Sequence, residues 1–168
     1  MKKILSYSLL SAAILTFTSA HAVTRDITVT ASIDPTVDIT LSDGTALPDT
    51  IAMSYLPSHG LNSVSRSVKL WSNSATADLT IALATSSPSL SAPTTTTTIP
   101  LTVTLNGIEL NTASSKLEFA EYFPNGITNG SITIPLVISQ TTKGVVSTAG
   151  DYSGTVSLVL AQATSQGS

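Results

Sequence analysis

The feature of this sequence that most constrains its fold is a regular alternation of apolar residues with Thr, Ser and other small residues. The alternation occupies six short runs, at residues 27–33, 51–55, 79–83, 99–105, 132–138 and 156–160. Successive side chains of a β-strand point to opposite faces, so a period of two is typical of strands with one buried and one solvated face. Thr is β-branched and polar, which suits the solvated face. The alternation therefore predicts an all-β protein.

Turn-forming residues separate these runs and indicate how the strands connect. Asn106-Gly107 stands between two alternating segments and predicts a tight hairpin, because both central positions of such a turn favour positive φ. The threonines at 94–98 are interpreted as a loop leading into a strand at Ile99, with a glycosylated stalk as the alternative. Only residues 113–122 have some helical character. Many short strands separated by turns predict an antiparallel, immunoglobulin-like sandwich.

The polar surface of such a sandwich comes from hydroxyl groups rather than from charges. Charged residues make up 10% of the sequence, against about 25% in ordinary soluble domains, whereas Ser and Thr number 26 and 27. The net charge of −3 leaves no basic surface that could neutralise phosphates, so no nucleic-acid partner is expected. The chain has no Cys, and its stability must come from burial and strand pairing. The single Trp, Trp71, is expected to be a core or interface aromatic.

The first residues have the pattern of a secretory signal peptide. Lys2 and Lys3 form a basic start, an apolar run follows at residues 4–18, and the Ala-His-Ala at residues 20–22 has the small-x-small form of a cleavage site. The alternative is an N-terminal membrane anchor, but serines interrupt the apolar run and a cleavage site follows it. No later stretch approaches the roughly 18 continuous apolar residues that a spanning helix needs. We therefore expect residues 1–22 to be removed and the protein to be exported.

Residues that could support catalysis or bind a metal are scarce. Beyond the signal peptide the one histidine is His59, and an exposed loop residue is a simpler interpretation than a catalytic base. One His and no Cys cannot form the usual zinc sites. Asp34, Asp38 and Asp43 are the only acidic concentration, but they lack the spacing of a calcium loop and suit turn or capping positions better. The sequence therefore predicts neither an enzyme nor a cofactor.

The start of the expected mature chain is unusual, because residues 23–33 form an alternating strand that begins at its first residue and is ended by Pro35. Two interpretations remain open from the pattern alone. The strand could complete the sheet of its own domain. Alternatively, it could be offered to the sheet edge of another molecule, with alternate side chains entering a groove there.

Four stretches resemble a known family. They are VTRDITVTASIDPTVD at residues 23–38, SDGTALP at residues 42–48, the predicted strand that ends at Tyr55 and is followed by Pro57, and AGDYSGTVSLVL at residues 149–160. Together they closely resemble the major pilins of the alternate chaperone–usher class, whose type member is colonisation factor antigen I, with the coli surface antigen 1 group beside it. The resemblance spans nearly the whole mature chain and is sharp at its two ends, whereas residues 61–127 match loosely.

The resemblance implies an immunoglobulin-like sandwich that lacks its final strand and therefore carries a hydrophobic groove. In such pilins a periplasmic chaperone fills the groove first. At the outer-membrane usher the N-terminal donor strand of the next subunit replaces it, which is a known case of strand addition to a sheet edge. The implied organisation is a signal peptide at 1–22, an N-terminal donor strand at 23–35 and a pilin domain at 36–168.

The resemblance also implies site residues and partners. The groove-filling side chains of the donor strand would be Ile27, Val29, Ala31 and Ile33. One groove wall, which is also the edge that the chaperone binds, would carry Tyr152, Val156, Leu158 and Leu160. The implied partners are identical subunits in a head-to-tail polymer, the periplasmic chaperone, the outer-membrane usher, a tip adhesin and a host glycoconjugate.

These observations predict the major structural subunit of a cell-surface fimbria that serves attachment to host cells, without enzymatic activity. Two other functions compete with this one. A minor tip adhesin usually carries an additional receptor-binding domain, and a chain of this length has room for one domain only. A secreted, monomeric carbohydrate-binding sandwich would need an exposed aromatic platform, and aromatic residues make up only 5% of the sequence.

Overall fold

The computed structural model describes residues 36–163. The predicted signal peptide at 1–22 and the predicted donor strand at 23–35 lie outside these residues. The elements are β1 Val37–Leu41, β2 Tyr55–Leu56, β3 Gly60–Leu61, β4 Val64–Ser72, β5 Leu79–Leu83, β6 Ser89–Ser91, β7 Thr98–Leu105, β8 Ile108–Glu109, β9 Ser115–Leu117, α1 Phe119–Tyr122, β10 Ile134–Gln140 and β11 Leu158–Gln162. Within this part of the chain, no helix has the length and apolarity needed to cross a membrane.

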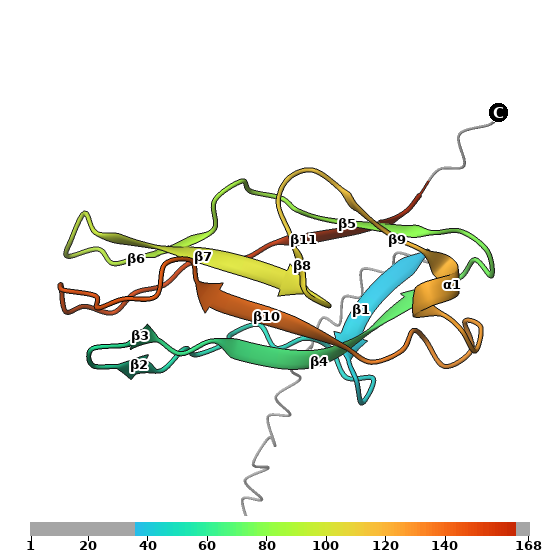
Figure 1. The fold of residues 1–168 in the computed structure, drawn as a ribbon, viewed down its shortest axis with the longest axis horizontal. Helices are drawn as coiled ribbons and strands as arrows, with labels where there is room; N and C mark the ends of the chain where they lie inside the picture. The colour runs from blue at the N-terminus through green and yellow to red at the C-terminus, as the bar shows by residue number, and fades with distance from the viewer. Residues whose placement is uncertain (1–35, 164–168) are drawn as a thin grey trace, which may run out of the picture. The chain divides into compact units, whose positions relative to one another are not determined.

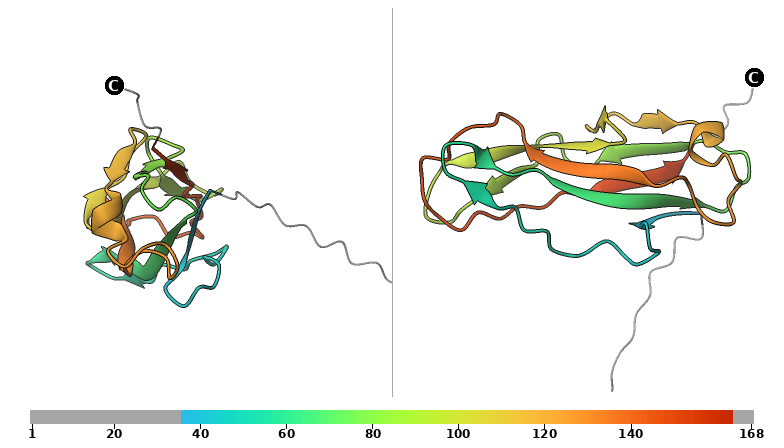
Figure 2. Two further views of the ribbon diagram at one scale, coloured as in Figure 1. Left: turned by 90° about the vertical axis from the view of Figure 1, so that its right-hand side faces the viewer. Right: turned by 60° about the horizontal axis from the view of Figure 1, so that its bottom comes forward.

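The strands form an antiparallel sandwich. The larger sheet has the order β1-β4-β10-β7-β6, with β8 paired to β7, and the smaller sheet has the order β11-β5-β9. A two-stranded hairpin, β2-β3, lies at the same end of the domain as β6 (Figure 1). The two sheets lie face to face (Figure 2). Every strand pair is antiparallel, so the prediction of an all-β antiparallel sandwich is confirmed.

The core forms where the apolar faces of the two sheets meet. In β7 the side chains of Ile99, Leu101, Val103 and Leu105 are buried, while the Thr and Pro residues between them are exposed or half-buried. This is the arrangement that a period of two predicts for a strand with one buried face. The buried cluster consists of Val37, Val68, Leu70, Leu79, Ile81, Leu83, Val103, Leu105, Leu110, Leu117, Tyr122, Phe123, Ile134 and Leu136.

Several strands coincide with the alternating runs, but two of them are displaced along the chain. β5 matches the run at 79–83, and β7 covers the run at 99–105, with the threonines at 94–98 leading into it as expected of a loop. β10 and β11 each begin and end two residues later than their runs. The displacement of β10 follows from pairing: Ile134 lies opposite Val68 of β4, whereas the backbone N–H of Ile132 donates to the Tyr122 carbonyl outside the sheet.

Two parts of the strand prediction are wrong. Residues 51–54 alternate regularly yet form no strand, because a strand depends on hydrogen bonds to a neighbour as well as on its own pattern. The longest strand, the nine-residue β4, was not predicted from the alternation. Arg66 lies on the same face of this strand as buried Val68 and Leu70 and interrupts the apolar series. β4 is stabilised instead by pairing with β1 on one side and β10 on the other.

The turns expected at Asn106-Gly107 and at Asp43 are present. Asn106 and Gly107, with φ of 50° and 81°, connect β7 to β8, which confirms the predicted hairpin. The Asp43 carboxylate accepts hydrogen bonds from the Thr45 backbone N–H and hydroxyl, at 2.9 and 2.6 Å, in the turn that follows β1. This confirms the turn role of Asp43, and among the described residues no acidic or His cluster could hold a metal ion.

Trp71 is half-buried on β4, on the opposite face of the strand from buried Leu70. Its Nε1–H donates to Thr40 Oγ1 at 2.9 Å, which ties β4 to β1. Gly130, with φ of 71°, lies against the indole, and a Cβ at this position would be 3.2 Å from the ring. Trp71 therefore holds a connecting loop against the outer face of the larger sheet and is not a core residue.

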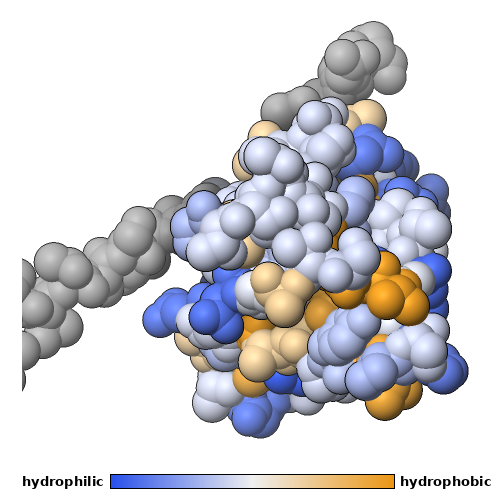
Figure 3. Space-filling model, turned by 90° about the vertical axis from the view of Figure 1, so that its left-hand side faces the viewer, coloured by the Kyte–Doolittle hydropathy of each residue, from blue (hydrophilic) through white to orange (hydrophobic). Residues whose placement is uncertain are grey.

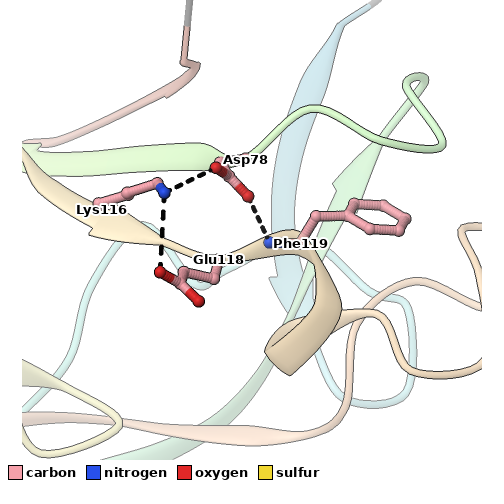
Figure 4. Close-up of polar contacts among 4 residues, drawn as sticks. All are labelled: Asp78, Lys116, Glu118 and Phe119. Atoms are coloured by element: carbon pink, nitrogen blue, oxygen red, sulfur yellow. Dashed lines mark hydrogen bonds and ion pairs between the residues drawn. The ribbon is translucent and has the colours of Figure 1, made fainter.

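The segment with helical character, 113–122, is helical only in its last four residues, and its first part contains β9. Asp78 fixes this segment to the start of β5 (Figure 4). One carboxylate oxygen accepts from the Phe119 backbone N–H at 2.7 Å, and the other lies 2.9 Å from Lys116 Nζ. Lys116 Nζ also lies 3.7 Å from Glu118. The hydrogen bond from Phe119, followed by that from Lys116, lowers the pKa of Asp78 below its ordinary value of 3.8.

The lowered pKa of Asp78 predicts a pH dependence of stability. A carboxyl group whose pKa is lower in the folded protein stabilises the fold above its ordinary pKa, and this contribution is lost as the pH falls through the folded value. Wild type should therefore resist urea better than Asp78→Asn at neutral pH. The difference should shrink as the pH falls below 3.8. Urea midpoints of both proteins across this range provide the measurement, and a difference that does not vary with pH would contradict the assignment.

Candidate functional site

A groove of about 990 Å³ lies between two segments that form no regular strand, residues 48–54 and 146–156. We call these segments the second wall and the first wall, respectively. The floor of the groove is apolar and consists of Leu90 of β6, Ile99 and Leu101 of β7, and Ile138 of β10. Because these side chains belong to the larger sheet, the groove reaches into the interior of the sandwich.

The first wall is bonded along one of its edges. Ser153 and Ser91 of β6 exchange two backbone hydrogen bonds of 2.9 and 2.8 Å, and the Ala84 N–H donates to the Ser157 carbonyl at 2.9 Å. β11 continues this pairing along β5 and is the last strand of its sheet. The first wall and β11 therefore form one edge, whose bonded side faces β5 and β6.

The second wall forms the opposite edge. The Asn62 N–H donates to the Ser54 carbonyl at 2.8 Å, which connects the end of this wall to the β2-β3 hairpin. Within residues 36–163 no backbone hydrogen bond joins 48–53 to 146–156 across the groove. Two edges separated by an apolar floor are suited to an added strand, which would pair with backbone groups and cover the floor with alternate side chains.

The groove reaches the β2-β3 hairpin at one end. Beyond its other end β1 and β11 have Cα atoms within 8 Å of each other, whereas a strand inserted between two neighbours needs about 9–10 Å. Gln162 of β11 bonds across this approach, because its Nε2 donates to the Thr36 carbonyl at 3.2 Å and to Asn73 Oδ1 at 2.6 Å. At the hairpin end, Tyr55 and Leu61 line the groove.

The structure separates the four residues predicted for the groove wall into two pairs. Tyr152 and Val156 line the groove, and Tyr152 Oη donates to the Thr148 carbonyl at 3.1 Å within the first wall. Leu158 and Leu160 lie in β11 and pack, half-buried, against the core. The predicted donor residues Ile27, Val29, Ala31 and Ile33 lie outside the described residues.

Sequence reasoning missed the floor and the second wall. The floor residues Ile99, Leu101 and Ile138 lie in alternating runs that were expected only to supply core, and Ile51 and Met53 lie in a run expected to be an ordinary strand. The alternation was the available signal, but it does not distinguish a side chain covered by the same chain from one that faces a groove.

The groove carries little charge. Asp49 and Asp151 are exposed lining residues, and no Lys or Arg is among the described residues that line it. His59, the other candidate for chemistry, is exposed in the β2-β3 loop as expected, with Nδ1 3.2 Å from Ser58 Oγ. The arrangement is therefore suited to binding an apolar extended segment.

Leu158→Asp should destabilise the domain itself. Leu158 is half-buried against the core and lies opposite Leu83 of β5. Desolvation of a carboxylate at this position would lower the free energy of unfolding by several kcal/mol. Val159, which is 50% exposed on the other face of the same strand, offers Val159→Asp as a matched control. We expect little folded Leu158→Asp protein and normal amounts of folded Val159→Asp protein. Equal amounts of the two would contradict this placement of Leu158.

Comparison with known proteins identifies the family. The family model for the CS1 type fimbrial major subunit matches residues 23–161. The chain belongs to this family. A CFA/I fimbrial subunit of Escherichia coli is 37% identical over 147 residues, covering 84% of this chain and 86% of that protein. A CS1 fimbrial subunit of Escherichia coli is 32% identical over 157 residues, covering 86% of this chain and 88% of the relative.

Solved structures of fimbrial proteins share the fold of this fimbrial subunit. The CooA pilin subunit from enterotoxigenic Escherichia coli matches with a TM-score of 0.68 and 29% identity, over 77% of this chain and 89% of that one. A chain from a chaperone–tip adhesin complex of CFA/I fimbriae biogenesis matches with a TM-score of 0.54 and 13% identity, over 77% of this chain and 42% of that one. The second likeness concerns the fold alone.

The family membership confirms the resemblance described from the sequence. This fimbrial subunit is a component of a cell-surface fimbria, and its fold is that of a pilin. A carbohydrate-binding monomer and a minor tip adhesin are not favoured, since the matched family and both relatives are fimbrial subunits.

Proposed function

We propose that the groove receives the N-terminal strand of a neighbouring subunit, so that the chain polymerises head to tail into the shaft of a fimbria that attaches to host cells. The observation that carries this proposal is the apolar groove between the first and second walls in a member of a fimbrial-subunit family. The donor side chains are Ile27, Val29, Ala31 and Ile33, which recur at every second residue and would face the floor together.

The proposal includes the path of the chain before assembly. Residues 1–22 act as the signal peptide, residues 23–35 as the donor strand and residues 36–168 as the pilin domain. An open apolar groove is an aggregation hazard. A periplasmic chaperone therefore covers the groove and binds along the edge formed by the first wall and β11. At the outer-membrane usher the donor strand of the next subunit replaces the chaperone. Such head-to-tail contacts do not close on themselves and therefore give an open fibre, at whose end a tip adhesin is placed.

The proposed role is structural rather than catalytic. Among the described residues no carboxylate forms an ion pair with His59, and no group of His, Asp and Glu could hold a metal. A base without an orienting partner does not make the arrangement that nucleophilic catalysis needs. The candidate host ligand is a glycoconjugate.

A chain that carries its own spare donor strand tests the proposal. A second copy of residues 23–35, joined after Ser168 by a short Gly-Ser linker, should fold back beside β11 and occupy the groove of the same molecule. We expect this protein to be a monomer by gel filtration and to unfold at a higher temperature than the unmodified subunit. The same protein with Val29→Asp in the spare copy is the control and should still polymerise. Polymerisation that is unaffected by the intact spare strand would overturn the proposal.

A further inference from the structure

Three large apolar side chains are exposed together at the end of the domain where the groove opens. Tyr55 and Leu56 of the β2-β3 hairpin are 43% and 46% exposed, and Val145 of the neighbouring loop is 61% exposed. We call these three residues the end patch. Figure 3 shows this end of the domain, with hydrophobic side chains reaching the surface among hydrophilic ones. The end patch is continuous with the groove, because Tyr55 also lines it.

The end patch is held in a defined shape by contacts between its two segments. Gln140 accepts a hydrogen bond from the Leu61 N–H at 2.9 Å and donates one to the Gly144 carbonyl at 3.3 Å. Gly60, with φ of 89°, approaches so closely that a Cβ would collide with the Gly144 carbonyl oxygen. Tyr55 Oη lies 3.5 Å from the Val146 carbonyl. The hairpin and the loop therefore present the patch as one surface.

The geometry of the groove decides which part of a neighbour reaches this surface. Beyond the far end of the groove β1 approaches β11, and Gln162 bonds to the Thr36 carbonyl there, whereas no backbone hydrogen bond between described residues crosses the groove at the end beside the patch. The donor strand is therefore expected to continue into its own domain beside the patch. From Ile33, the last groove-filling residue, to Thr36, the first described residue of the domain, the chain extends at most about 11 Å. The body of the donor subunit must therefore lie against the patch.

The surface of the donor that surrounds Thr36 is suited to this contact. The Thr36 carbonyl accepts a hydrogen bond from the Asn73 N–H at 3.0 Å, which places the β4-β5 turn beside the base of the donor strand. Residues 73–77 of this turn, Asn-Ser-Ala-Thr-Ala, carry no charge. An uncharged turn can cover apolar side chains without burying an unpaired charge, which would be costly.

We propose that the end patch of Tyr55, Leu56 and Val145 is a second contact between successive subunits and packs against the β4-β5 turn of the neighbour that donates its strand. This inference rests on the proposed function, because it takes donor-strand exchange as the event that brings the two domains together. The donor strand connects the subunits, and the end patch limits how far they bend relative to each other. Its occupant is a second copy of this chain.

The absence of Cys from the sequence allows a direct test by cross-linking. One chain combines Leu56→Cys in β2 with Thr76→Cys in the β4-β5 turn, and both positions are exposed. β2 and this turn lie at opposite ends of the domain (Figure 1). Filaments of this variant are treated with a short bis-maleimide. We expect a ladder of covalent dimers and longer oligomers under denaturing conditions. Leu56→Cys with Ser65→Cys, exposed on the side of the sandwich, is the matched control and should give no ladder.

A second measurement examines stiffness and does not depend on cross-linking. Filaments of Leu56→Ser/Val145→Ser should form in normal number but have a shorter persistence length in electron micrographs than wild type. Ser65→Ala, on the side of the sandwich and away from the patch, should leave the persistence length unchanged. Intact filaments that give no Leu56–Thr76 ladder and keep wild-type stiffness would overturn the end-patch contact while leaving donor-strand exchange standing. The two proposals can be overturned separately. If the chain with a second copy of residues 23–35 after Ser168 still polymerises, donor-strand exchange itself is wrong.

Discussion

Val29→Asp should abolish filaments while leaving the subunit folded and bound to its chaperone. Val29 lies in the middle of the alternating donor residues, so the substitution would place a carboxylate in the groove of a neighbour. Burial of Ile27, Val29 and Ile33 contributes about 5–9 kcal/mol at roughly 1.5–3 kcal/mol each, before ordering costs. An unpaired buried charge costs several kcal/mol, which is comparable with much of this gain. The measurement is surface filaments and chaperone-bound subunit in the same cells.

The neighbouring residue offers a matched control for this prediction. Thr28 has the opposite side-chain direction in an extended strand, so Thr28→Asp places the same charge away from the floor and should preserve filaments. The alternative interpretation of residues 23–33, in which they complete their own domain, predicts that Val29→Asp loses chaperone-bound subunit as well. Loss of both subunit and filaments would therefore count against the donor-strand assignment.

Gly154→Ala should distort the first wall of the groove and sharply reduce assembly-competent subunit. A Cβ at this position would collide with the Ser89 carbonyl oxygen and lie 3.2 Å from Leu90 Cδ2. The nearest atom is backbone of β6, which cannot move aside as a flexible side chain can, so the paired Ser153 and Ser91 would have to separate. Forced overpacking of this kind typically costs about 1–3 kcal/mol. The measurement is the thermal midpoint of the chaperone-bound subunit together with filament yield.

Gly150→Ala is the control in the same wall. The nearest neighbours of a Cβ there are Ala92 Cβ at 3.4 Å and Thr94 Oγ1 at 3.5 Å, which are ordinary contacts. We expect Gly150→Ala to assemble as wild type does. If both substitutions behave alike, the close approach of Gly154 to β6 is not what shapes the groove.

Local pattern predicted those elements whose stability depends on nearby residues. β5 and β7 occur where apolar residues alternate, and the β7-β8 turn occurs where Asn106-Gly107 provides positive φ. β10 and β11 were displaced by two residues because strand ends are decided by which residues find partners, such as Leu158 opposite Leu83. β4 was not found, since Arg66 breaks its apolar face and its pairing with two neighbours compensates.

Residue order alone predicts the all-β class, the hydroxyl-rich surface, the family resemblance and the alternating residues proposed for the donor strand. Each of these depends on the order of side chains along one stretch of chain. Pairing between distant segments, in contrast, places residues 48–54 and 146–156 on two sides of Leu90, Ile99, Leu101 and Ile138, and brings Gln162 to the Thr36 carbonyl. Tyr152 and Val156 line the groove, whereas Leu158 and Leu160 lie in β11 and do not; Val156, Leu158 and Leu160 all pack against the core. The physical reason is that a groove is a property of edges without partners, and strand pairing between distant segments determines which edges those are.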